Sequence, residues 1–154
     1  MTNSGKAIIL TYAPVTEEEK NILQNTEIYK LAINQHGSIY KPDLRIVSDY
    51  ILLKILPKFP EKVISIRERL RCPSKRVEYF DTEFKGATII SAVQYLYFKG
   101  YSEILIVGDN LVNGIEFQNL VKSEIGKIPS NLKMYQYSKG NFNLPIRSIK
   151  DFCD

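Results

Sequence analysis

Short apolar runs alternate with helical patterns along the chain, and this alternation constrains the fold more than any other feature of the sequence. The runs are continuous and short, which is typical of strands buried on both faces of a sheet. They lie at Ala7–Thr11, Tyr29–Ile33, Leu44–Val47, Val63–Ile66, Ile104–Val107 and Leu132–Tyr137. Strands that alternate with helices predict βαβ units. We therefore expect an α/β fold, with a mostly parallel sheet of about six strands and helices on both faces.

Helical patterns fill most of the intervals between these runs. Thr16 with Glu19 three residues later is a capping-box signature, which predicts a helix that begins at Thr16. The clearest helix begins at Gly86, places several apolar side chains on one face and ends at Gly100. Further helices are expected at Tyr50–Leu56, at Ile115–Ile125 and, as a final short helix, from Pro145 onward.

The size and composition of the chain fit one globular domain that spans residues 1–154. A length of 154 residues is ordinary for a single domain, and 44% hydrophobic with 25% charged residues is a globular composition. The sequence contains no apolar run long enough for a membrane span and no signal-peptide pattern, so we expect a cytoplasmic location. Cys72 and Cys153 have no metal-ligand or disulfide spacing, and we expect free thiols and no metal site.

The positive charge of the chain is concentrated in one segment. Residues 67–76 contain five basic residues and one acidic residue, a net charge of +4, which equals that of the whole chain. Three interpretations are open: contact with nucleic-acid phosphates, a clamp for a phosphorylated or sugar-acid ligand, or a solvated loop. The segment lacks the interleaved aromatic residues of a single-strand binder, so no nucleic-acid partner is favoured.

Polar or small residues follow the predicted strands at the points where they end. These residues are Thr11, Asn34, Ser48 with Asp49, Gly108 with Asp109, and Ser138. In an open parallel α/β sheet, ligands bind outside the carboxyl ends of the strands. The pattern therefore predicts a ligand-binding edge, although Asn, Asp and Gly also form turns for purely structural reasons.

The sequence contains no standard phosphate-binding loop, neither a dinucleotide fingerprint nor a P-loop. Lys85, Gly86, Ala87 and Thr88 lie at the start of a predicted helix, whose N-terminus could hold a nucleotide phosphate or could simply be a cap. His36, the single histidine, is a candidate general base or an ordinary loop residue.

Several stretches, in order along the chain, resemble a known family. In Leu31–Gln35 and Pro42–Asp49 an Asn ends one strand, and a Pro-Asp pair leads the next strand to an Asp. This arrangement resembles the front half of the motility accessory factor and pterin pyrophosphokinase-like family. Gly86–Val93 and Lys99–Asp109 are similar to that family's central helix and strand, a core that the bacterial sialyltransferases of Campylobacter type share. Leu132–Ser138 is similar to their last core strand.

The resemblance implies a single Rossmann-like domain that binds a nucleotide or a CMP-sugar at the strand ends. Position by position, it implies that Asn34, Ser48 and Asp49 line a nucleoside pocket, that Lys85, Gly86 and Ala87 meet the nucleotide, and that Gly108 and Asp109 fall near the family's Gly-x-Asp. If the chain is an enzyme, the resemblance implies a glycosyltransferase-like transferase.

The chain departs from the family at two places. The family's Gly-x-Gly-Pro-Ser loop after the first strand is replaced by Tyr12–Thr16, which keeps only the proline. The sialyltransferases also carry paired tyrosines and a catalytic histidine after the Gly-x-Asp strand, and Asn110–Lys127 contains neither a tyrosine nor a histidine. The usual glycosyl-transfer mechanism therefore has no evident proton carrier, so we expect reduced activity.

Three functional hypotheses stay open from the sequence. The first is a nucleotide- or CMP-sugar-binding domain of the glycosyltransferase kind. The second is a non-catalytic interaction module that kept the fold and binds a protein partner or a second copy of the chain. The third is a Mg²⁺-dependent pyrophosphoryl or nucleotidyl transferase with Asp49 and Asp109 near the metal. If the chain is an enzyme of any of these kinds, the catalytic candidates are His36, Asp49 and Asp109.

Overall fold

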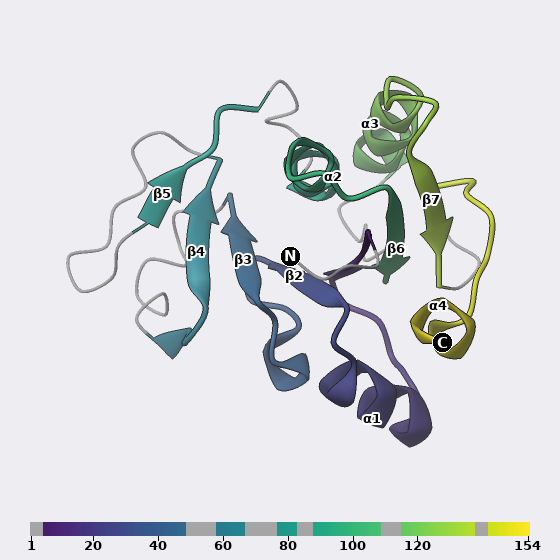
Figure 1. Ribbon diagram of the computed structural model, residues 1–154. Helices are drawn as coiled ribbons and strands as arrows, with labels where there is room; N and C mark the ends of the chain where they lie inside the picture. Colours follow the sequence, from purple (N-terminus) through teal and green to yellow (C-terminus); the bar gives the residue numbers. More distant parts are fainter. Residues whose placement is uncertain (1–4, 49–57, 67–76, 83–87, 109–114, 138–141) are drawn as a thin grey trace.

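The computed structural model describes residues 5–48, 58–66, 77–82, 88–108, 115–137 and 142–154, with backbone alone for 115–118 (Figure 1). Seven strands form one sheet in the order β5-β4-β3-β2-β1-β6-β7. The strands are β1 (Lys6–Leu10), β2 (Tyr29–Ile33), β3 (Leu44–Val47), β4 (Lys62–Ser65), β5 (Val77–Tyr79), β6 (Glu103–Val107) and β7 (Lys133–Gln136). Every neighbouring pair is parallel. The predicted α/β fold with a parallel sheet is confirmed.

The strand number is the main correction to the sequence prediction. All six predicted strands are present to within one residue at each end, and the structure adds β5 as a seventh. This strand has three residues, lies at the edge of the sheet and is only partly buried. It therefore lacks the continuous apolar run that identifies an interior strand from sequence.

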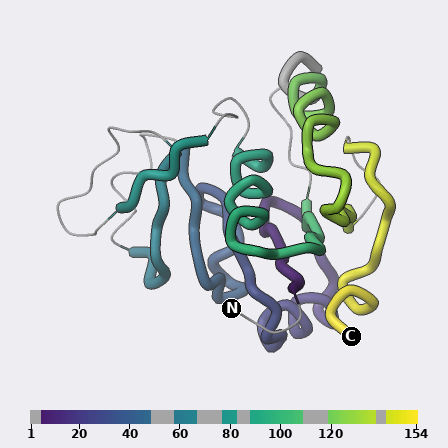
Figure 2. The backbone as a smooth tube through the Cα atoms, turned by 45° about the horizontal axis from the view of Figure 1, so that its top comes forward, coloured from purple at the N-terminus to yellow at the C-terminus, as the bar shows by residue number. Residues whose placement is uncertain are grey.

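Helices cover both faces of the sheet, as predicted (Figures 1 and 2). On one face, α1 (Glu17–Asn25) packs against α4 (Ile149–Cys153) and against the short 3₁₀ helix η1 (Ser38–Tyr40). On the other face, α2 (Thr88–Phe98) lies over β1, β2 and β3 and also contacts α3 (Ile115–Ile125). None of the helices in the described part of the chain is long and apolar enough to cross a membrane.

The helix boundaries test two sequence predictions. The capping box of α1 is present, because the Thr16 hydroxyl accepts from the Glu19 N–H and the Glu19 carboxylate accepts from the Thr16 N–H. The prediction that Pro145 begins the last helix is wrong. The chain around Pro145 instead hydrogen-bonds to Gln136 of β7, and α4 begins only after its N-cap, Ser148. Pairing with the open edge of β7 satisfies backbone groups that the edge would otherwise expose.

Two hydrophobic clusters, one on each face of the sheet, form the core. Helix α2 contributes buried residues to the larger cluster, among them Ile90, Val93 and Leu96. Its sequence contains no charged residue, which is consistent with a helix buried over most of its surface. The smaller cluster joins Ile8 and Leu10 of β1 to α1 and α4. Both faces of the central strands are thus buried, and the sheet presents its ends and loops to ligands.

Candidate functional site

The strand order places one topological switch point in the sheet. Strands β2 to β5 are added in sequence on one side of β1, and the chain then returns through α2 to place β6 on the other side of β1. The connections after β1 and β6 therefore lead away in opposite directions from adjacent strand ends. This point, at the carboxyl ends of the strands, is where open α/β sheets bind ligands.

Asn34 lies at the carboxyl end of β2 with its side chain turned toward β3. Its backbone is left-handed, with φ 51°, a conformation that asparagine tolerates better than most residues. The side-chain Oδ1 accepts a hydrogen bond from the Ser48 N–H at 3.0 Å. Because a backbone N–H can only donate, the oxygen is the end of the amide that faces Ser48. The amide NH₂ group has no hydrogen-bond partner among the described residues, which leaves two donors for a ligand.

Ser48 links the end of β3 to the start of α2. Its Oγ lies 2.7 Å from the Oγ1 of Thr88, the first residue of α2, and 3.5 Å from the Asn34 Oδ1. The three polar side chains come from positions far apart in the sequence. The structure thus brings together three residues for which ligand contact was predicted, Asn34 and Ser48 at the strand ends and Thr88 at the start of the helix.

Arg45 holds this loop in place and was not predicted from the sequence. It lies on β3 with a fully buried side chain, and one terminal nitrogen donates to the carbonyl oxygens of Asn34 and His36, both at 2.6 Å. The other terminal nitrogen donates to the Ser38 Oγ at 2.9 Å. Nε donates to the Glu61 carboxylate, and the guanidinium lies 4.0 Å from the centre of the Phe59 ring. In the sequence, Arg45 stands within an apolar strand pattern that gives no sign of these contacts.

His36, two residues after Asn34, lies next to Tyr12. The centres of their rings are 6.1 Å apart, and the planes are tilted by 58°. Burial lowers the pKa of His36 below its ordinary value, and the positive charge of Arg45 lowers it further. His36 is therefore neutral at pH 7 and can accept a proton. Tyr12 is exposed, with 60% of its surface accessible, at the end of the central strand.

Gly108 brings the connections after β1 and β6 into direct contact. Its φ is +100°, and a Cβ atom at this position would lie 2.2 Å from the Tyr12 carbonyl oxygen. The ladder between the two strands also continues one step further, since the Thr11 N–H donates to the Val107 carbonyl at 3.1 Å. Only glycine permits this approach. The structural role of Gly108 is therefore to join the two loops.

The N-terminus of α1, which follows β1, is occupied by the chain itself. Besides the capping box, the Tyr137 hydroxyl donates to the Glu19 carboxylate at 2.7 Å. Burial raises the pKa of Glu19, but hydrogen bonds from Thr16 and Tyr137 outweigh it and lower the pKa overall. Burial, with the Glu19 contact, raises the pKa of Tyr137 to about 12. An ionised carboxylate therefore fills the position where a phosphate would bind in a dinucleotide-binding fold.

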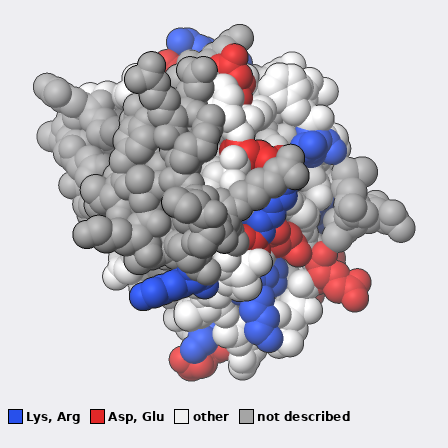
Figure 3. Space-filling view, turned by 90° about the vertical axis from the view of Figure 1, so that its left-hand side faces the viewer, with Lys and Arg blue, Asp and Glu red and all other residues white. Residues whose placement is uncertain are grey.

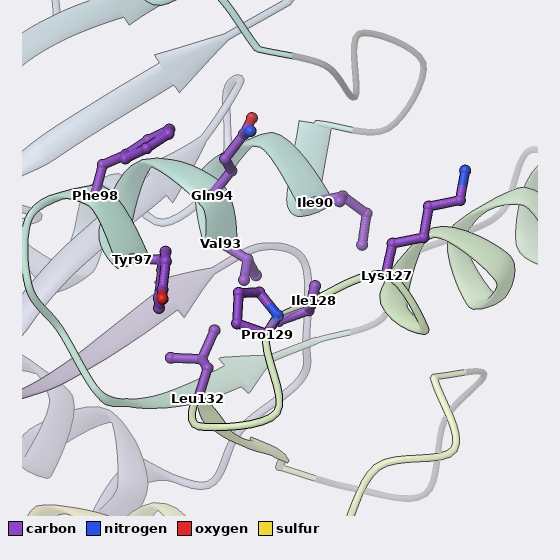
Figure 4. Close-up of a pocket in the computed structure, with 9 residues that line it drawn as sticks. All are labelled: Ile90, Val93, Gln94, Tyr97, Phe98, Lys127, Ile128, Pro129 and Leu132. Atoms are coloured by element: carbon purple, nitrogen blue, oxygen red, sulfur yellow. The ribbon is translucent and has the colours of Figure 1, made fainter.

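Two hollows lie away from the strand ends, and no predicted ligand residue lines either of them. The first, of about 210 Å³, lies between α2 and the segment before β7, and Figure 4 shows the facing side chains of Val93, Tyr97 and Leu132. The second, of about 280 Å³, lies between β4, β5 and the end of α2. On the face shown in Figure 3, basic and acidic residues are mixed over the described part of the surface. Lys62 and Glu78 form one exposed ion pair.

The remaining predicted residues lie outside the described part of the chain. These are Asp49, Lys85, Gly86, Ala87, Asp109 and Ser138, with the predicted helix at residues 50–56 and the basic segment at residues 67–76. Among the described residues, no group of three or more His, Cys, Asp or Glu could hold a metal ion. Cys153 is a free thiol, and burial raises its pKa.

Comparison with known proteins gives no relative: no family model, no curated protein and no solved structure matches the chain.

Proposed function

We propose that this domain binds a nucleotide or a nucleotide sugar at the carboxyl edge of its sheet. The observation that carries the proposal is the Asn34 amide, whose oxygen is used by Ser48 and whose NH₂ group has no partner among the described residues. Base carbonyls, ribose hydroxyls and phosphate oxygens all accept hydrogen bonds from such a group. The Ser48 and Thr88 hydroxyls lie beside it. The resemblance of the surrounding stretches to nucleotide-sugar enzymes supports the same ligand class.

For a bound nucleotide sugar, we propose glycosyl transfer as the reaction class, at a reduced rate. His36 is the described group that suits proton transfer, because its lowered pKa keeps it neutral at pH 7. If His36 is the general base that takes the proton of the acceptor hydroxyl, His36→Gln should lower turnover of a CMP-sugar at least tenfold, since loss of a general base typically costs about 10²–10⁴-fold. Turnover that is unchanged in this variant would remove His36 from the reaction.

The binding test is thermal unfolding of the chain with CMP, CMP-sugars and other nucleotides at millimolar concentration. A ligand at a hundredfold excess over its Kd stabilises the folded state by about 2.7 kcal/mol. For a domain of this size that corresponds to a rise in Tm of about 5 °C or more. If no nucleotide raises the Tm, the proposal is wrong, and the hypothesis of a non-catalytic interaction module takes its place.

A matched pair of variants tests the residue that carries the proposal. Asn34→Asp keeps an oxygen for the Ser48 N–H but replaces the two amide donors with a negatively charged acceptor. It should abolish the nucleotide-dependent rise in Tm. Asn143→Asp is the control, because Asn143 is exposed and has the same left-handed backbone, with φ 56°. It should leave the rise unchanged, and equal effects of the two variants would contradict the assignment of Asn34.

A further inference from the structure

We infer that the ligand is a mononucleotide whose base stacks on the ring of Tyr12, on the β2 side of β1. This inference rests on the proposed nucleotide binding and narrows it to one nucleoside per site. It also makes Tyr12 a binding residue. Three features of the described chain carry it: the contact between two loops, the self-capped α1 helix, and the position of the Tyr12 ring.

The contact at Gly108 blocks the space that the pyrophosphate of a dinucleotide would occupy. In dinucleotide-binding sheets, the two nucleosides lie on either side of the switch point and the pyrophosphate crosses it. Here the backbone at Gly108 lies so close to Tyr12 that even a Cβ atom would come within 2.2 Å of the Tyr12 carbonyl oxygen. The loops after β1 and β6 therefore touch where the pyrophosphate would pass between them. One nucleoside on one side of the contact fits this geometry.

The start of α1 disfavours a phosphate for an electrostatic reason as well. The first turn contains Glu17, Glu18 and Glu19, and the Glu19 carboxylate accepts hydrogen bonds from Thr16 and Tyr137. A phosphate placed there would have to displace a paired carboxylate and approach two further negative charges. The phosphate of the ligand therefore does not lie at this helix.

Tyr12 offers the aromatic surface that a base requires. Its ring is 60% exposed, and the backbone beneath it is fixed by the contact with Gly108. The ring touches that of His36, two residues after Asn34, so the aromatic surface and the amide donors of Asn34 lie on the same side of β1. Every nucleobase can stack on such a ring, and the Asn34 amide can then donate to a base or ribose oxygen.

The test is calorimetric titration of the full chain with AMP, CMP, GMP, UMP and NAD. At least one mononucleotide should bind, and NAD should bind no tighter than AMP, which is one of its halves. Tyr12→Ala should weaken the best mononucleotide roughly 5- to 100-fold, the range expected for loss of one base-stacking contact. Tyr12→Phe should stay within about twofold of the wild type, because the ring is kept. Phe98→Ala is the control, since Phe98 is also an exposed aromatic residue, at 66%, but lies at the far end of α2.

The possible failures are distinguishable. NAD binding more than tenfold tighter than AMP would overturn the mononucleotide inference and leave the proposed function standing. Mononucleotide binding that is equal in the wild type and in Tyr12→Ala would overturn the stacking role of Tyr12. If no nucleotide binds, the proposed function fails and this inference fails with it. Circular dichroism of each variant verifies that loss of binding is not loss of fold.

Discussion

The buried ion pair of Arg45 and Glu61 should couple two strands and the loop that carries Asn34. The side chains are 0% and 4% exposed, so both charges are removed from water. Removing one partner leaves the other buried and unpaired, which typically costs about 3–5 kcal/mol of unfolding free energy. Loss of Arg45 also leaves the carbonyl oxygens of Asn34 and His36 without their donor. We therefore expect each single substitution, Arg45→Met or Glu61→Leu, to destabilise the fold by about 3 kcal/mol or more.

A double-mutant cycle separates the coupling of the pair from these other losses. For Arg45→Met combined with Glu61→Leu, we expect a coupling energy of about 2–3 kcal/mol, since the double variant has no unpaired charge. The control is the neighbouring pair of Lys62 and Glu78, whose side chains are 52% and 41% exposed. The cycle of Lys62→Met with Glu78→Leu should give less than about 1 kcal/mol, because water screens exposed pairs.

Urea unfolding at pH 7, followed by circular dichroism, measures both cycles. The slope of the unfolding free energy against urea should be the same in all variants, so that differences in midpoint report stability. A coupling energy at Arg45 and Glu61 that is no larger than that of the exposed pair would contradict this expectation. Burial of the two side chains would then not raise the coupling energy of the ion pair.

Three further substitutions test individual features of the fold. The folded state lowers the pKa of His36, so the unfolded state binds a proton first as the pH falls below about 6.5, and stability that is present above this pH is lost below it. Urea unfolding at pH 7.5 and 5.0 should therefore show a smaller loss of unfolding free energy in His36→Gln than in the wild type. An equal loss in the two proteins would contradict this. Lys41 has φ 53°, and Lys41→Gly should stabilise by up to about 1 kcal/mol by removing left-handed strain, so a lower midpoint in urea would count against it. Gly108→Ala should destabilise the fold by about 3 kcal/mol or more, because the added Cβ clashes with Tyr12. Gly126→Ala, whose added Cβ has an ordinary contact of 3.5 Å, should change stability by less than about 1 kcal/mol. Equal losses of thermal stability in the two variants would contradict the close approach of Gly108 to Tyr12.

The fold was predictable because its central strands are buried on both faces. Continuous apolar runs such as Tyr29–Ile33 and Leu44–Val47 are strong local signals, and both strands have the predicted bounds. The capping box at Thr16 is likewise a local pattern, and the structure contains it. The edge strand β5 and the pairing of the chain near Pro145 with β7 depend on neighbours distant in sequence. Local patterns do not report such contacts.

The location of the candidate site was predictable, but the residues that hold it in place were not. Asn34 and Ser48 follow strong strand patterns, and the rule for parallel sheets places their ends at one edge. The structure brings them together as that rule implies. Arg45 gave no signal, since a charged residue within a strand pattern does not indicate which groups it contacts, and Thr88 was predicted only as part of the start of its helix. Tyr12 also gave no signal, because the Tyr12 backbone is held by a contact with Gly108, which is distant in sequence.

The most direct test of ligand binding at the strand ends is an amide NMR titration of the ¹⁵N-labelled chain with CMP and the other mononucleotides. The N–H signals of Asn34, Ser48 and Thr88 should shift with a common saturation curve, while those of Tyr97 and Phe98, beside the hollow of Figure 4, should stay in place. Shifts confined to Tyr97 and Phe98, or no shift at millimolar ligand, would contradict a nucleotide site at the carboxyl edge of the sheet.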